Sequence, residues 1–166
     1  MAPLQLPGNV STAAFTCRIP PAALAGTKVR PSIYGHGLLG GQGEVGQDQV
    51  AEMIREHGFM YCATDWEGFA TEDIGTVVAS LVDMDRFPAV IDHTQQGELN
   101  FLHLARLLIH PEGLSSSPEF QVGGTSFIDT TRAYYDGNSQ GGIYGGTVMA
   151  VAPDIDSGVL GVPGIN

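Results

Sequence analysis

A serine lies between two glycines in a setting that would make it a nucleophile. Gly137 lies two residues before Ser139 and Gly141 two residues after it, which gives the pattern Gly-x-Ser-x-Gly. The pattern follows a strand-like segment, 133–138, and comes before a small-residue segment, 140–151, with helical character. A serine on a sharp strand-to-helix turn has strained backbone angles and needs small neighbours, and its hydroxyl is lifted clear of the sheet. The alternative is an ordinary tight turn, since the sequence holds 23 glycines.

Three residues about a hundred positions upstream would supply a second part of the same chemistry. His36, Gly37 and Leu38 follow the apolar segment 29–34. Acyl transfer at a serine needs backbone N–H groups that stabilise the negative oxygen of the intermediate, and one of them comes from a loop after a strand. The alternative for this run alone is a glycine-rich turn with a surface histidine. Together with Ser139, it favours a serine hydrolase.

Three runs of residues resemble the α/β-hydrolase esterases and lipases. They are Gly-His-Gly-Leu-Leu-Gly at 35–40, Ala-Thr-Asp-Trp-Glu-Gly at 63–68 and Gly-Asn-Ser-Gln-Gly-Gly at 137–142. The resemblance covers roughly residues 13 to 166. It implies an α/β-hydrolase fold, which is a three-layer α/β sandwich with a mostly parallel sheet.

The resemblance also implies roles for single residues. Ser139 would be the catalytic nucleophile, and the backbone N–H groups of Leu38 and Gln140 would form the oxyanion hole. Three further residues would support the loop or line the pocket, namely His36, Gly37 and Trp66. Trp66 is open to a second interpretation, as a packing residue. A bulky residue after His-Gly is similar to the lipase-like group that accepts medium or long acyl chains. The resemblance implies no metal ion and no organic cofactor.

The sequence does not reveal the base and the acid of such a site. In the family an acid and then a histidine follow the serine, but here only 27 residues follow Ser139. Asp154 and Asp156 precede the last expected strand, so they are expected at the opposite end of the sheet. None of the five histidines is expected to be the base. His36 is expected in the oxyanion loop, His57 at a helix end, and the other three on a long helix (His93, His103 and His110). We therefore expect residues 1–166 to be the N-terminal portion of a single α/β-hydrolase domain. The remainder is expected on a second chain from a cleaved precursor.

Five strands and three helices are expected to position these residues. Apolar and β-branched runs predict strands over 13–19, 29–34, 59–64, 133–138 and 159–162. Helical spacing predicts helices over 47–56 and 87–109, and a run of small residues after the serine motif indicates a third over 140–151. Gly58 is expected to end the first helix, and an interruption of the second at Gly97 stays open. The glycines at 142, 145 and 146 are expected to pack closely on the sheet, and 114–125 is expected to be a surface loop.

Charge and composition exclude several classes of protein. The 18 acidic and 7 basic residues give a net charge of −11, which disfavours nucleic acid as a partner. No apolar run is long enough to span a bilayer. Cys17 and Cys62 are too few for a disulfide scaffold or a zinc site, and they are expected as buried thiols or as one bridge. A bridge would require an oxidising compartment. We expect a secreted or extracellular protein, with a cytoplasmic one as the alternative.

The expected function is hydrolysis of carboxylic esters through an acyl-enzyme on Ser139. The substrate would be a small-molecule or lipid ester, and the partner would be the C-terminal chain of the same precursor. One alternative is a hydrolase-like domain that binds or assembles without catalysis, which the missing base favours. Another is a peptidase or a polyester hydrolase of the same fold.

Overall fold

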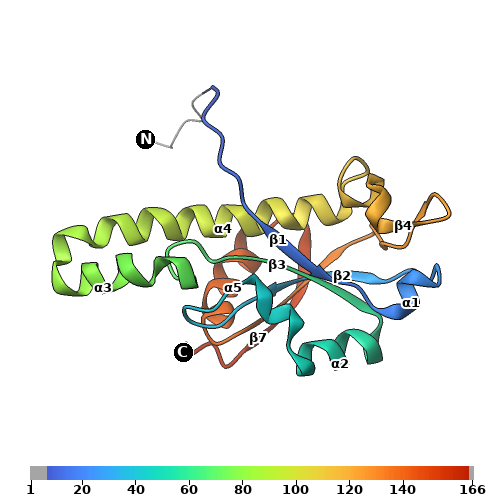
Figure 1. Ribbon diagram of the computed structural model, residues 1–166, viewed down its shortest axis with the longest axis horizontal. Coiled ribbons are helices and arrows are strands. Elements are labelled where there is room, and N and C mark those ends of the chain that lie inside the picture. The colour runs from blue at the N-terminus through green and yellow to red at the C-terminus, as the bar shows by residue number, and fades with distance from the viewer. Residues whose placement is uncertain (1–6, 165–166) are drawn as a thin grey trace.

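A single five-stranded sheet forms the centre of the computed structural model, which describes residues 7–164. Its strands follow the order β1-β3-β2-β6-β7 (Figure 1). They are β1 (Phe15–Arg18), β2 (Arg30–Gly35), β3 (Phe59–Thr64), β6 (Ala133–Asn138) and β7 (Ile155–Gly161). Four of them run parallel, and β1 pairs antiparallel with β3. The prediction of a mostly parallel sheet is confirmed.

Helices cover both faces of this sheet. Two, α4 (Phe87–Ile109) and α5 (Gln140–Val151), pack on one face, and α2 (Asp48–His57) packs on the other. Consecutive side chains of a strand point to opposite faces, so Ile33 belongs to the first core and Tyr34 to the second. The two cores give the expected three layers. The remaining short elements are α1 (Pro21–Leu24), α3 (Ile74–Val82), β4 (Gln121–Val122) and β5 (Thr125–Ser126).

Several predicted elements differ from the observed ones in ways that have physical reasons. Helix α4 is not interrupted at Gly97, because that glycine is buried where α4 meets the backbone of Glu67. Strand β7 begins at Ile155 rather than at 159, and its start is not predicted because the exposed Asp-Ser-Gly at 156–158 separates Ile155 from the later apolar residues. Segment 114–125 is more than a surface loop, since Leu114 and Phe120 are buried and a short β4–β5 hairpin begins there. A Cβ on Gly146 would meet no atom within 4 Å, so the prediction that Gly146 packs closely on the sheet is wrong.

Helix α3 is not predicted by the sequence patterns, and it is unusual in composition. It contains no charged residue, and it lies alongside the first half of α4 at one end of the molecule (Figure 1). Most of its large apolar side chains are exposed, together with one in the turn that follows: Ile74, Val78, Leu81, Val82 and Met84. No helix within residues 7–164 combines the length and the apolar character that crossing a membrane requires.

The two cysteines form a disulfide bond that joins the edge strand β1 to β3. Cys17 and Cys62 are register partners in the antiparallel pair, and their Cα atoms are 4.0 Å apart. Of the two states that the sequence leaves open, the structure has the bridge.

Candidate active site

Ser139 occupies the sharp turn between β6 and α5. Its φ of 56° and ψ of −114° are rare for a residue with a side chain and store backbone strain. Two hydrogen bonds hold the turn, from the Ser139 N–H to the Gly161 carbonyl (3.0 Å) and from the Ile143 N–H to the Ser139 carbonyl (3.0 Å). The side chain is exposed at the carboxyl edge of the sheet. This is the geometry of a nucleophile elbow.

The glycines of the motif are required by contacts between backbones. A Cβ at Gly137 would lie 2.5 Å from the Gly141 carbonyl oxygen, and a Cβ at Gly141 would overlap the carbonyl of Gly35. Gly35 is the last residue of β2 and pairs with Gly137 in the sheet. The Tyr135 hydroxyl also donates to the Gly141 carbonyl. The elbow is therefore packed directly against the end of β2, where the histidine-glycine loop begins.

His36 holds this loop from the inside and is fully buried. The Trp66 N–H donates to His36 Nε2 at 2.8 Å, so the ring proton belongs on Nδ1, which faces the Gly37 carbonyl at 2.8 Å. Burial lowers the pKa of His36 below its ordinary value and keeps the ring neutral. With both ring nitrogens occupied, His36 supports the loop and is not free to act as a base.

Glu44 holds the same loop from the other side. Its carboxylate accepts a hydrogen bond from the Gly37 N–H (3.2 Å), and a Cβ on Gly40 would overlap it. Leu39 adopts a φ of 53°, which is uncommon for a residue with a side chain. The residue before it, Leu38, is 64% exposed. The loop is thus fixed in one conformation while its tip faces solvent.

The two predicted oxyanion donors both have unused N–H groups. The N–H groups of Leu38 and Gln140 have no acceptor among the described residues. Gln140 is the first residue of α5, where backbone N–H groups lack intrahelical partners and the helix dipole favours negative charge. The strand pairing of Gly35 with Gly137 brings both loops to the same edge of the sheet.

Trp66, the third expected supporting residue, is a core residue. Its ring is fully buried and stacks on Phe101 with centroids 3.6 Å apart. Its connection to the site is the backbone N–H that binds His36. The indole Nε1 and the Gln140 Oε1 are both buried without a hydrogen-bond partner among the described residues.

No other histidine approaches the elbow through any described contact. His57 ends α2, and His93 pairs with Asp73 at 3.5 Å. His103 faces a surface groove beside residues 9–15, and His110 caps the end of α4. Asp154 pairs with Arg106 at 3.0 Å before β7 begins, at the end of the sheet opposite to the elbow. Among residues 7–164, no three His, Cys, Asp or Glu side chains gather as ligands for a metal ion.

Sequence reasoning does not find the residues that hold the oxyanion loop. Glu44 lies in a glycine-rich stretch with no pattern around it, and Phe69 contacts the loop through its backbone carbonyl. A backbone contact leaves little trace in a sequence, because most side chains are compatible with it. Only the glycines at the contact points carry a signal.

Comparisons with known proteins give structural similarities only. No model of a known protein family matches the sequence, and no curated protein is significantly similar to it. One similar solved structure is Est1E from Butyrivibrio proteoclasticus with bound ferulic acid. It is 16% identical with a TM-score of 0.45, and the match covers 89% of this chain and 47% of that chain. Another is an acylaminoacyl peptidase from Pyrococcus horikoshii, 14% identical with a TM-score of 0.43, covering 88% of this chain and 20% of that chain. The chain thus spans less than half the length of either structure.

Proposed function

We propose that this chain carries the nucleophile of a serine hydrolase of the α/β-hydrolase type that cleaves carboxylic esters. The observation that carries the proposal is the backbone of Ser139, with a φ of 56° on a strand-to-helix turn. Strain of this kind persists where the surrounding structure enforces it, and it is concentrated at functional sites. The unused N–H groups of Leu38 and Gln140 add the donors that acyl transfer needs.

The reaction would proceed in two steps. The Ser139 hydroxyl attacks the ester carbonyl while a base takes its proton, and the two N–H groups stabilise the oxyanion. The alcohol leaves with the proton from the base, which gives an acyl-enzyme. Water then attacks the acyl group, gives its proton to the same base and releases the carboxylic acid, with the serine regenerated.

The base would come from another polypeptide, since no described histidine other than His36 lies near the elbow, and both ring nitrogens of His36 are occupied. We assign it to the C-terminal remainder of the same precursor, which would carry an Asp or Glu followed by a His. Two observations support a covering partner: Ser139 is exposed, and β7 is an edge strand without a neighbour on its outer side among the described residues.

Two further features bear on the substrate and the compartment. The exposed apolar side chain of Leu38 in the oxyanion loop fits an ester with an apolar acyl group, from a small molecule or a lipid. The disulfide between Cys17 and Cys62 fits an oxidising compartment, and we therefore propose a secreted or extracellular protein.

Labelling with a fluorophosphonate probe, together with p-nitrophenyl ester turnover, tests the proposal in the complete enzyme. Ser139→Ala should abolish both signals and leave the fold intact, while Ser157→Ala, an exposed serine on β7, should change neither. A complete enzyme that is neither labelled nor active would support the non-catalytic binding alternative. Labelling with turnover of amides or polyesters in place of small esters would support the peptidase or polyester alternative.

A further inference from the structure

The loop after β3 lies against the oxyanion loop and fixes its backbone. The Leu39 N–H donates to the Phe69 carbonyl (3.1 Å), and the Thr71 N–H donates to the Gly40 carbonyl (2.9 Å). The Thr71 hydroxyl lies 3.0 Å from the Leu39 carbonyl oxygen and 2.9 Å from that of Gly40. These contacts hold Leu39, the residue directly after the proposed donor Leu38, in its left-handed conformation.

One carbonyl of this loop contacts both halves of the proposed oxyanion hole. Besides the Leu39 N–H, the Phe69 oxygen accepts a hydrogen bond from Gln140 Nε2 at 3.3 Å. Leu39 follows one proposed donor and Gln140 is the other. The Phe69 carbonyl therefore links the residue that follows one proposed donor to the side chain of the residue that carries the other.

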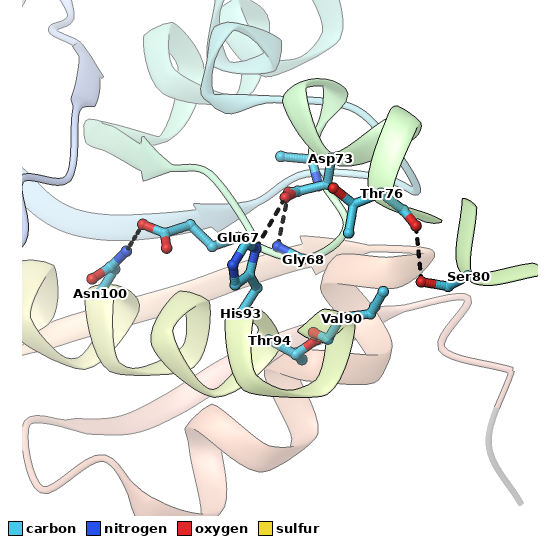
Figure 2. A network of polar contacts seen from close by, with 10 residues as sticks. Glu67, Gly68, Asp73, Thr76, Ser80, Val90, His93, Thr94 and Asn100 are labelled. Carbon is cyan, nitrogen blue, oxygen red and sulfur yellow. Dashed lines mark hydrogen bonds and ion pairs between the residues drawn. The ribbon is translucent and has the colours of Figure 1, made fainter. Parts of the chain in front are cut away.

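Asp73 holds the Phe69 peptide in place. Its Oδ2 accepts hydrogen bonds from the N–H groups of Gly68 (2.8 Å) and Ala70 (3.1 Å), the two residues that flank Phe69. Figure 2 shows the carboxylate between the Gly68 backbone and His93 of α4, whose Nδ1 lies 3.5 Å from Asp73 Oδ1. The Asp73 side chain is only 14% exposed.

The same loop is pressed against α4, so the carboxylate acts on a segment with little freedom to shift. Gly68 has a φ of 93°, and a Cβ there would lie 2.8 Å from the Thr94 nitrogen and the Val90 oxygen (Figure 2). A rigid support of this kind transmits a small displacement rather than absorbing it.

We infer that Asp73 is a positioning residue for the oxyanion hole, acting through the Phe69 carbonyl. The inference rests on the proposed function, because it assigns a role in that reaction. The position of one carboxylate oxygen is what matters, since Oδ2 makes both backbone hydrogen bonds. A residue with an oxygen at the same place should replace Asp73, and a residue with a displaced oxygen should not.

Three substitutions in the complete enzyme separate these cases. Asp73→Ala removes the oxygen and Asp73→Glu displaces it by one methylene group, so both should lower kcat about 10- to 100-fold with KM within about twofold. The inhibition constant of a trifluoromethyl ketone, which mimics the oxyanion, should rise by the same factor. Asp73→Asn keeps a carbonyl oxygen that can accept both backbone hydrogen bonds. Its kcat should therefore stay within about threefold of that of the parent.

The matched control is Asp83→Ala, at the other end of α3. Asp83 also accepts a backbone N–H, that of Asp85 (3.3 Å), and pairs with Arg86 (3.2 Å), but it does not contact the loop. It should leave kcat unchanged. The inference is overturned if Asp73→Ala and Asp73→Glu behave like Asp83→Ala, or if Asp73→Asn loses as much kcat as Asp73→Ala. If Asp73→Ala fails to fold, the kcat values of Asp73→Glu and Asp73→Asn are compared instead, and equal values would overturn the inference.

A readout that needs no catalysis separates this inference from the proposed function. Amide hydrogen exchange at Leu39 and Thr71 should be at least about 10-fold faster in Asp73→Glu than in the parent, and unchanged in Asp83→Ala. An unlabelled, inactive parent enzyme would refute the proposed function and, with it, the role in the oxyanion hole. Normal labelling of the parent with unchanged exchange and kcat in Asp73→Glu would refute the inference alone.

Discussion

At the scale of single residues, the proposed oxyanion hole consists of backbone N–H groups rather than of side chains. The N–H of Leu38 has no acceptor among the described residues, and the side chain of Leu38 is largely exposed, so under the proposed function the residue would contribute mainly a donor. Leu38→Pro removes that donor. In the complete enzyme we expect the substitution to lower kcat for p-nitrophenyl esters by ~10²–10³-fold, the usual loss for one oxyanion donor.

The control for this prediction is Leu38→Ala, which keeps the N–H. Its kcat should stay near that of the parent enzyme, with any change confined to KM because the apolar side chain is shortened. Equal losses of kcat in both variants would mean that the side chain of Leu38, and not its N–H, supports the reaction.

Asp136 gives the folded state a pH dependence of its own. It lies in β6 and accepts a hydrogen bond from the Tyr61 hydroxyl (3.0 Å), and burial raises its pKa above the ordinary value of 3.8. As the pH rises from 3.8 to this raised pKa, the unfolded chain loses the proton before the folded one does. The free energy of unfolding therefore falls across that window and stays lower above it.

Asp136→Asn should remove this loss, because an amide cannot ionise and still offers Tyr61 an oxygen. Urea unfolding measured between about pH 3.5 and pH 7 should show a smaller fall in stability for the variant than for the parent. Asp156→Asn, at an exposed position of β7, is the control for the loss of one negative charge. Parallel curves for Asp136→Asn and the parent would contradict the prediction.

At the scale of elements, the contact of α4 with the loop after β3 is set by one glycine. A Cβ on Gly97 would lie 2.8 Å from the Glu67 nitrogen and 3.0 Å from its carbonyl oxygen, both backbone atoms that cannot move aside cheaply. We expect Gly97→Ala to lower the free energy of unfolding by about 1–3 kcal/mol in spite of the better helix propensity of alanine.

Gly146, in the middle of α5, is the matched case without this contact. Nothing lies within 4 Å of a Cβ at that position, so Gly146→Ala should raise the free energy of unfolding by about 0.5–1 kcal/mol. Denaturant melts of both variants test the pair. The contact argument fails if both glycines respond to alanine with the same sign.

Sequence patterns predict those elements that have a regular apolar spacing or that lie beside a recognisable motif. The strand 133–138 and the helices 87–109 and 140–151 have the predicted bounds, and Gly58 ends α2 in the left-handed conformation as expected. Helix α3 is not predicted because it is short, has no charged residue to mark an outer face and is rich in β-branched residues, which favour strands. The turn at Ser139 is predictable because a side chain at its glycines would clash with neighbouring backbone. The role inferred for Asp73 is not predictable, because it depends on contacts between segments that only the fold brings together.

At the scale of the whole molecule, the disulfide ties the edge strand β1 to the parallel part of the sheet. Cys17 and Cys62 are 45 residues apart in the sequence, and closing a loop of that size stabilises a protein by on the order of 4 kcal/mol in the chain-entropy model. We expect the paired substitution Cys17→Ala with Cys62→Ala to lower the urea midpoint accordingly. Dithiothreitol should have a similar effect on the parent and no effect on the double variant, and an unchanged midpoint in both experiments would contradict this.

The outer edge of β7 also bears on how much folded protein a cell accumulates. Of the five strands of the sheet, β7 is the last to leave the ribosome. No described strand pairs with its outer side, so its backbone groups there can pair with another extended chain until the proposed partner covers them. Asp156 and Ser157, exposed at the start of the strand, make that edge a poor template for wrong partners. Substituting valine for both Asp156 and Ser157 should therefore change the amount of folded protein and not its activity. The molecules that fold would keep their turnover number, while the soluble yield would fall and recover at lower growth temperature or with added chaperones.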